Sequence, residues 1–260
     1  VGELRPAAPL RRVLVANRGE IAVRIVRACR AEGVDAIVAV SQADQDSLGA
    51  RLATDVVHIG PPSPSQSYLR VEQIVAGALL AGCDAVHPGY GFLSERATLA
   101  EACDEHGLVF IGPSADTIRR GGDKVEARRI ARAAGVPTGA GSDAVSGAAE
   151  ALAIAAEVGY PVLLKAAAGG GGRGIVRVDD PDELMARFAT ASNEAQAAFG
   201  DGRMYVERYV ENARHVEVQL LGDRHGTIVH LGDRDRSTQR RFQKLVAEAP
   251  AGPLSTDVRE

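Results

Sequence analysis

The sequence predicts an α/β fold, with a parallel sheet covered by helices in the first half of the chain and a distinct α+β unit in the second half. In the first half, short and almost wholly apolar segments alternate with helical patterns, as in parallel sheets whose strands are buried on both faces. In the second half, one strand follows another directly at two places, which is typical of antiparallel pairing. The length of 260 residues is compatible with one large domain or two small ones.

The first half contains apolar segments that we expect to form strands, with helical patterns between them. The strands are expected at residues 12–16, 36–40, 56–60, 84–86 and 108–112, and the helices at 21–32, 71–80 and 95–106. Gly33 is placed to end the first helix, because glycine adopts the left-handed conformation of a helix C-terminus without strain. We expect this unit to close near Gly121 and Gly122.

The second half opens with a helix and then changes pattern. Asp123 is the expected N-cap, with Glu126 three residues later as in a capping box, and the helix is expected to end at Gly135, before Pro137. Further helices are expected at residues 146–158 and 182–198, and strands at 161–166, 175–178 and 204–207. A long hairpin is expected from residues 215–221 and 227–231.

The composition limits the classes of function. Hydrophobic residues make up 45% and charged residues 25%, which is ordinary for a globular protein. A net charge of −4, with five Tyr, five Phe and no Trp, argues against nucleic-acid binding. No apolar stretch approaches the roughly 20 residues that span a membrane, and the first residues lack a signal-peptide core, so we expect a soluble, cytoplasmic protein. The three scattered cysteines predict neither disulfides nor a zinc site.

A glycine-rich loop at residues 165–174 is the strongest single feature of the sequence. Consecutive glycines let backbone N–H groups surround an anion such as a triphosphate. Gly169, Gly171 and Gly174 fit the spacing G-x-G-x-x-G, but a dinucleotide fingerprint leads from a strand into a helix, whereas this loop leads into a second strand. The pattern resembles a flap that folds over a nucleotide, and a mobile hairpin tip is the alternative.

Two lysines are further candidates for binding an anion. Lys165 ends an apolar strand, where a solvated lysine would interrupt a buried run, so we expect it to face a negative group. Lys124 lies in the first turn of a helix, where a cation is unfavourable unless an anion also binds there. A simple exposed lysine is the alternative for Lys124.

The segment from Gln239 to Lys244 carries three cations in six residues. If it is extended, Arg240, Phe242 and Lys244 share one face. A solvated basic strand and internal ion pairing with Asp233, Asp235 or Glu248 are both compatible with this pattern. His215 stands at the start of a strand, where a lone histidine is usually structural.

Together these segments resemble the biotin carboxylases of the ATP-grasp superfamily over nearly the whole chain from Arg12. The resemblance rests on strings that occur in the family's order: residues 15–22 (VANRGEIA), 87–95 (HPGYGFLSE), 112–114 (GPS), 122–124 (GDK), the loop at 165–174, 214–217 (RHVE) and 239–241 (QRR). It implies a Rossmann-like, parallel-sheet pre-ATP-grasp domain at residues 1–121 and part of an α+β ATP-grasp domain at 122–260, including a lid at about 138–209.

The resemblance also implies a reaction. ATP would phosphorylate bicarbonate to carboxyphosphate, which delivers carbon dioxide to N1′ of biotin on a carrier domain, as the first half-reaction of a biotin-dependent carboxylase. The implied partners are a biotin carboxyl carrier domain and a carboxyltransferase subunit or domain. A homodimer and the identity of the final carboxyl acceptor are left open. Lysines, a metal ion and a closing flap supply the charge neutralisation and exclusion of water that such phosphoryl transfer needs.

The family's site residues can be carried over one by one. Lys244 matches the lysine that binds bicarbonate. The residues that match ATP-binding positions are Lys124 and Lys165 at the phosphates, Gly171 and Gly172 in the covering loop, Glu207, Arg208, Tyr209 and Val210 in the adenine-contacting connection, and His215, Gln239 and Phe242 near the nucleotide.

The sequence departs from the family in two ways. Phe242 stands where family members commonly have a polar residue, often His, and a phenyl ring cannot donate the hydrogen bond that such a residue makes to the nucleotide. The sequence also stops at Glu260, whereas family members continue through a C-terminal domain. The acidic residues that bind Mg²⁺ or Mn²⁺, the general base and the arginines that hold biotin are expected beyond Glu260. The chain alone is therefore expected to be incomplete and inactive.

Two other functions are compatible with parts of the pattern. Another ATP-grasp ligase, such as a carbamoyl-phosphate-forming domain, shares the lid and the acyl-phosphate chemistry, but we do not expect it to carry the strings at residues 17–20 and 87–91. A non-catalytic subunit that binds nucleotide or partner subunits is indicated by Phe242 and by the stop at Glu260.

Overall fold

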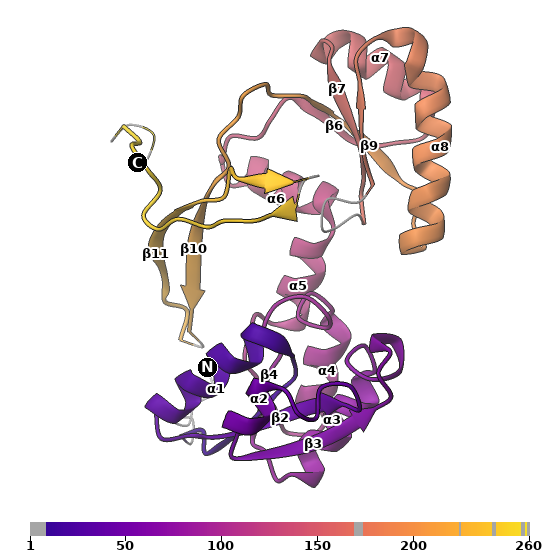
Figure 1. The fold of residues 1–260 in the computed structure, drawn as a ribbon. Coiled ribbons are helices and arrows are strands. Elements are labelled where there is room, and N and C mark those ends of the chain that lie inside the picture. The colour runs from indigo at the N-terminus through magenta and orange to yellow at the C-terminus, as the bar shows by residue number, and fades with distance from the viewer. Residues whose placement is uncertain (1–8, 169–173, 224, 241–242, 256–257, 259–260) are drawn as a thin grey trace. The chain divides into compact units, whose positions relative to one another are not determined.

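The computed structural model describes residues 9–168, 174–223, 225–240, 243–255 and 258. The chain divides into two compact units, Val1–Gly122 (unit 1) and Asp123–Glu260 (unit 2). Figure 1 shows unit 1 in indigo to magenta and unit 2 in magenta to yellow. Unit 1 has two buried clusters of apolar side chains, and unit 2 has one of its own among the described residues.

Unit 1 contains a five-stranded parallel sheet in the order β3-β2-β1-β4-β5. Its strands are β1 (Arg12–Val15), β2 (Asp35–Ser41), β3 (Asp55–Gly60), β4 (Ala85–His87) and β5 (Val109–Phe110). Successive residues of a strand point to opposite faces, and in β1 both faces are apolar and buried. The predicted parallel sheet, buried on both sides, is confirmed.

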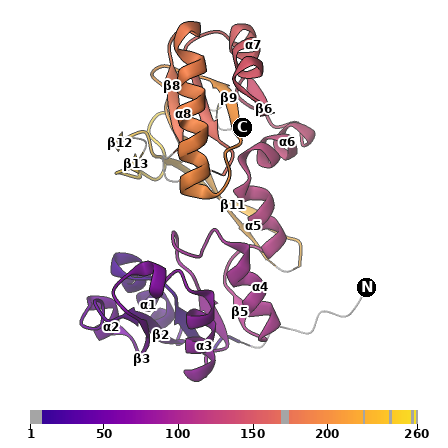
Figure 2. The same cartoon turned by 90° about the vertical axis from the view of Figure 1, so that its right-hand side faces the viewer.

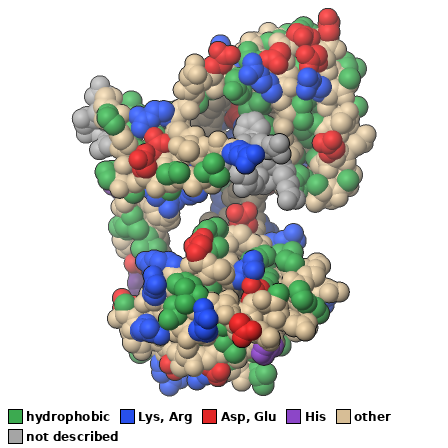
Figure 3. All heavy atoms as spheres, viewed as in Figure 1, with side chains coloured by type: hydrophobic (Ala, Val, Ile, Leu, Met, Phe, Trp, Pro, Cys, Tyr) green, Lys and Arg blue, Asp and Glu red, His purple; other side chains and the backbone are tan. Residues whose placement is uncertain are grey.

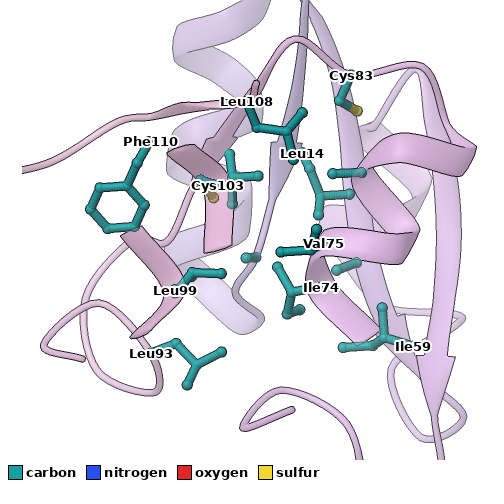
Figure 4. Close-up of a cluster of buried hydrophobic side chains, with 14 of the residues drawn as sticks. Leu14, Ile59, Ile74, Val75, Cys83, Leu93, Leu99, Cys103, Leu108 and Phe110 are labelled. Atoms are coloured by element: carbon teal, nitrogen blue, oxygen red, sulfur yellow. The ribbon is translucent and has the colours of Figure 1, made fainter. Parts of the chain in front are cut away.

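Helices cover both faces of this sheet. They are α1 (Gly19–Ala31), α2 (Leu48–Leu52), α3 (Val71–Leu80), α4 (Ala97–Glu105) and α5 (Ala115–Gly122), with a 3₁₀ turn at Pro64–Gln66. Val13 and Val15 pack with apolar residues of α1, whereas Leu14 packs with residues of α3 and α4. Figure 4 shows side chains of this second cluster, among them Leu14, Val75 and Leu99. The sequence did not predict α2 or α5.

The three cysteines, Cys29, Cys83 and Cys103, are free thiols in these clusters. Burial raises the pKa of Cys83 and of Cys103 to about 11, so both thiols are protonated at neutral pH. Their expected role as small buried residues is confirmed.

A buried carboxylate, Asp44, organises the loop that follows β2. It accepts hydrogen bonds from Arg18 at 2.6 Å, from the Ser41 hydroxyl at 2.7 Å and from the Tyr68 hydroxyl at 3.1 Å. Burial alone would raise the pKa of Asp44, but these donors outweigh it and hold the pKa below its ordinary value. Asp44 therefore stays ionised and links three segments of unit 1.

We expect Asp44→Asn to destabilise unit 1 by about 1–3 kcal/mol, because the buried Ser41 and Tyr68 donors lose their charged acceptor. A lowered pKa means that Asp44 stabilises the fold above the ordinary aspartate pKa of about 3.9, and that this contribution is lost as the pH falls through its folded-state value. Urea unfolding at pH 7 and at acid pH measures both effects. Asp46→Asn, at an exposed position in the same loop, is the control. An unchanged acid dependence in Asp44→Asn would contradict the assignment.

Unit 2 contains a four-stranded antiparallel sheet in the order β6-β9-β7-β8. Its elements are α6 (Lys124–Ala133), β6 (Gly141–Val145), α7 (Ala148–Val158), β7 (Val162–Ala166), β8 (Ile175–Val178), α8 (Pro181–Phe199) and β9 (Met204–Arg208). Figure 2 shows α7 and α8 beside this sheet. Leu164 and Val206 lie in one cluster with apolar residues of both helices. The predicted antiparallel sheet is confirmed, with β6 as an additional strand.

The rest of unit 2 forms two antiparallel strand pairs. β10 (Val216–Gly222) pairs with β11 (Ile228–Asp235) as the sequence predicts, and β12 (Gln239–Arg240) pairs with β13 (Gln243–Lys244). The pairing of β12 with β13 places Gln239 opposite Lys244, so the segment is not the single extended strand that would put Arg240 and Lys244 on a common face. Large apolar side chains of β10 and β11 are 45–73% exposed: Val218, Leu220, Leu221, Ile228, Val229 and Leu231.

Charged side chains are mixed on the surface. On the face shown in Figure 3, basic and acidic side chains are interspersed over each unit, in keeping with the near balance of 30 basic and 34 acidic residues. Among the helices in the described ranges, none has the length and apolar content that crossing a membrane requires.

Candidate functional site

In unit 1, the strings at residues 15–22 and 87–95 meet at the carboxyl ends of β1 and β4. Asn17 is fully buried, and its side-chain amide donates to the carbonyl oxygens of Pro88 at 2.8 Å and of Tyr90 at 2.9 Å. The Tyr90 hydroxyl donates to Glu20 at 2.6 Å. Gly89 has φ +66°, and a Cβ there would lie 2.8 Å from the Asn17 amide. These residues hold two loops together at the point where the strand order reverses, so the motif has a structural role here.

In unit 2, the start of α6 lies beside the end of β7, where the glycine-rich loop begins. Asp123 caps α6 by accepting from the N–H groups of Val125 at 2.9 Å and Glu126 at 3.0 Å, as predicted. Lys124 is the first residue of the helix, and its backbone N–H donates to the carbonyl of Ala167 at 3.4 Å. A helix N-terminus and two lysine-bearing segments therefore converge at the loop, which is an arrangement suited to an anion.

The sheet of unit 2 presents a polar face opposite its apolar one. Leu164 and Val206 face α7 and α8, so Lys165, Tyr205 and Glu207 lie on the other side. The Lys165 ammonium contacts the Glu207 carboxylate. The prediction that Lys165 faces a negative group is confirmed, and in this structure that group belongs to the protein. Burial first, and the charge of Glu207 second, raise the pKa of Tyr205 to about 12, so its phenol is uncharged.

A second cluster surrounds Glu217 on β10. Its carboxylate contacts Arg234 at 2.7 Å, Arg236 at 3.3 Å and Lys244 at 3.1 Å, and the His215 ring lies 3.8 Å away. Partial burial would raise the pKa of Glu217, but Lys244 and the two arginines hold it below its ordinary value. Three cations around one carboxylate leave an excess of positive charge that suits a small anion. Lys244 takes part in an internal ion pair, but its partner is Glu217, whereas the sequence pattern indicated Asp233, Asp235 and Glu248.

The pKa of His215 reports on this cluster. Burial lowers it below its ordinary value, Lys244 lowers it further, and Glu217 acts in the opposite direction. We therefore expect Lys244→Met to raise the pKa of His215 and Glu217→Gln to lower it. An NMR titration of the His215 ring measures both shifts, with exposed His230 on β11 as the internal reference. If the pKa of His215 shifted in the same direction in both variants, the opposite effects assigned to Lys244 and Glu217 would be wrong.

The other predicted site residues lie at the end of β9, just after it, in β12 or outside the described residues. Arg208 is the last residue of β9. The guanidinium carbon of Arg177 lies 4.4 Å from the centre of the Tyr209 ring. Val210 is 62% exposed. Gln239 is the register partner of Lys244. Gly171, Gly172 and Phe242 fall outside the described residues. The structure thus groups Lys165 with Glu207, and His215 with Glu217 and Lys244.

Family comparisons match both units. Residues 9–118 match the family model described as "Biotin carboxylase, N-terminal domain", and residues 123–260 match the one described as "Carbamoyl-phosphate synthase L chain, ATP binding domain". A biotin carboxylase from Nostoc sp. is 48% identical over 96% of this chain. A crystal structure described as a biotin carboxylase complex with "beta-gamma-ATP" from Campylobacter jejuni superposes with a TM-score of 0.93 over 96% of this chain, at 46% identity.

The chain belongs to the biotin carboxylase family. It spans about half of the curated relatives it matches, covering 56% of the Nostoc protein and 56% of biotin carboxylase 1 from Bacillus subtilis, which is 47% identical over 96% of this chain. A second structure, the biotin carboxylase domain dimer of 2-oxoglutarate carboxylase from Hydrogenobacter thermophilus, is described with MgADP, ADP and bicarbonate, and has a TM-score of 0.92 at 44% identity over 97% of this chain.

Two features of this chain were not predicted from its sequence. Glu217 stands in the string RHVE but was assigned no role, although its place between His215 and a basic segment was a usable signal. Arg128 on α6 contacts Glu207 across 79 positions of sequence. A helix pattern contains no information about such a distant partner, so the sequence carried no signal for this contact.

Proposed function

We propose that this chain is the nucleotide-binding part of a biotin carboxylase that uses ATP and bicarbonate to carboxylate biotin on a carrier domain. A bicarbonate oxygen attacks the γ-phosphorus of ATP, ADP leaves, and carboxyphosphate forms. Carboxyphosphate then gives carbon dioxide and phosphate, and N1′ of biotin takes up the carbon dioxide as it loses a proton. The observation that carries this proposal is the similarity of both units to the Campylobacter jejuni ATP complex, at a TM-score of 0.93.

The proposed roles of individual residues follow the two clusters of unit 2. Lys124 and Lys165 bind phosphate oxygens beneath the loop that contains Gly171 and Gly172. The segment from Glu207 to Val210 contacts adenine, while His215, Gln239 and Phe242 lie near the nucleotide. Lys244 binds bicarbonate, and its place in a cluster with excess positive charge supports this role. These residues lie in the proposed ATP-grasp domain at 122–260, with its lid at about 138–209, after a pre-ATP-grasp domain at 1–121.

The part of the chain that the structure describes contains no candidate site for the divalent ion of the reaction. Within the described ranges, no group of three or more His, Cys, Asp or Glu side chains could hold a metal ion. These described residues therefore do not fit Mg²⁺ or Mn²⁺, and we propose that the ligands of the ion belong to another part of the protein.

We propose that further polypeptide also covers the apolar surface of β10 and β11. Six large side chains there are 45–73% exposed, which is costly in water and typical of a surface that is buried in an interface or a larger fold. The relatives are longer than this chain, which covers 56% of the Nostoc protein. A carrier domain and a carboxyltransferase would be partners of the complete protein, which we place in the cytoplasm; a homodimer is compatible with the Hydrogenobacter dimer.

The test is ATP cleavage by the complete gene product, measured with and without bicarbonate and free biotin. We expect cleavage that requires bicarbonate and is stimulated by biotin. ATP binding without any biotin stimulation would contradict the proposal. Turnover with ammonia or carbamate in place of biotin would favour the carbamoyl-phosphate-forming alternative. A non-catalytic role loses support if Phe242→His brings no gain in ATP affinity.

A further inference from the structure

Arg128 on α6 is held on several sides beneath the sheet of unit 2. Its Nη1 donates to Oε1 of Glu207 at 2.6 Å, and its Nη2 donates to the carbonyl of Gly139 at 2.8 Å. The guanidinium lies 5.8 Å from the centre of the Tyr205 ring. The Arg128 side chain is 12% exposed. An arginine ordered to this degree, away from water, is held in one geometry by its contacts.

Two glycines at the start of β6 and just before it lie close to Arg128 and Glu207. A Cβ on Gly141 would lie 3.2 Å from Nη2 of Arg128 and 2.4 Å from the carbonyl oxygen of Val206. A Cβ on Gly139 would lie 3.5 Å from Oε1 of Glu207. The contact at Gly139 would be an ordinary one, so the close approach of β6 to Val206 and Arg128 depends on the missing side chain at Gly141.

Glu207 is shared between two cations. Its Oε1 accepts from Arg128, and its Oε2 contacts the Lys165 ammonium. Each of the three side chains is 12–21% exposed. The cluster of two cations and one carboxylate has a net charge of +1, whereas Lys165 and Glu207 alone would sum to zero. Arg128 follows Lys124 by four residues on α6, so the two lie on the same side of the helix.

We propose that Arg128 is a positioning residue for nucleotide binding, acting through Glu207 on Lys165. This inference rests on the proposed function, in which Lys165 binds ATP phosphates. Arg128 fixes one oxygen of Glu207, so that the other oxygen holds the Lys165 ammonium at the end of β7. Arg128 also offsets the charge of Glu207, so that a net positive charge remains for the phosphates. The contribution of Arg128 to affinity should therefore grow with the number of phosphates on the ligand.

The test compares dissociation constants for ATP and for adenosine in the complete gene product. Removing the cation in Arg128→Met brings the cluster to zero charge, and we expect ATP to bind about tenfold more weakly while adenosine changes by less than about twofold. Glu207→Gln alone brings the charge to +2. The double variant Arg128→Met with Glu207→Gln returns it to +1, and its preference for ATP over adenosine should recover to within about threefold of the wild type. Arg128→Lys should recover part of the loss.

Arg187→Met is the matched control. Arg187 also pairs with a glutamate, Glu183, but both residues belong to α8, which packs against the apolar face of the sheet. We expect it to leave both dissociation constants unchanged. A loss of ATP and adenosine affinity in equal measure in Arg128→Met would overturn the inference. A double variant as weak as Arg128→Met would overturn the part of the inference that rests on net charge. Thermal unfolding of each variant identifies a protein that fails to fold. If the wild type binds neither ligand, the proposed function itself fails, which differs from either of these results.

Discussion

Replacing Lys244 with alanine is expected to lower bicarbonate-dependent ATP cleavage by about 10²- to 10³-fold, which is the loss typical of removing one electrostatic stabiliser from a transition state. The affinity for ATP should change much less, because Lys244 pairs with Glu217, whereas the proposed phosphate-binding Lys165 pairs with Glu207. The fold should survive, since Arg234 and Arg236 still compensate Glu217. Steady-state kinetics of the complete gene product over a range of bicarbonate concentrations, with ATP binding measured separately, provide the comparison.

Arg234→Ala is the matched control for this experiment. This variant also removes a cation that contacts Glu217, but Arg234 has no proposed contact with bicarbonate. A smaller loss in Arg234→Ala than in Lys244→Ala would show that the effect comes from Lys244 itself and not from a disturbed ion pair. If Lys244→Ala lost ATP affinity and bicarbonate dependence to the same degree, the role assigned to Lys244 would be wrong.

Elements with a strong local signal were predicted well from the sequence. The helix at Val71–Leu80 and the strand at Ile175–Val178 have the predicted bounds. Asp123 caps α6 as expected, and Gly33 follows α1 with φ +69°. In these cases the pattern of apolar residues or the chemistry of a cap is contained in neighbouring residues, so no distant contact is needed to determine the structure.

Elements that depend on distant contacts were missed. β6 has the sequence GSDAV, which has low strand propensity, and it forms because β9 pairs with it. Gly141 in this strand is required by its approach to the Val206 carbonyl, which the local sequence does not reveal. The candidate site shows the same division. Lys165 stood out because a cation interrupts an apolar strand, but its partner Glu207 and the supporting Arg128 become neighbours only when β7, β9 and α6 pack together.

Truncating the core of unit 2 should have the largest effect on stability. Leu164 is fully buried in the central region of the sheet, where β7 lies between β8 and β9 and packs with residues of α7 and α8. We expect Leu164→Ala to cost about 2–5 kcal/mol, because the lost burial is accompanied by a cavity that the rigid surroundings fill incompletely. Met185→Ala on α8, where the side chain is 52% exposed, is the control and should cost much less.

The loss of stability in Leu164→Ala should be confined to unit 2, because the apolar cluster of unit 2 shares no residues with the clusters of unit 1. Hydrogen exchange followed by mass spectrometry can resolve this, since peptides from β7 and β9 should lose protection in Leu164→Ala while peptides from β1 and β2 keep theirs. Leu164 also points away from the polar face that carries Lys165, so under conditions where unit 2 remains folded its nucleotide affinity should be retained. A uniform loss of protection across both units would show instead that they unfold as a single cooperative structure.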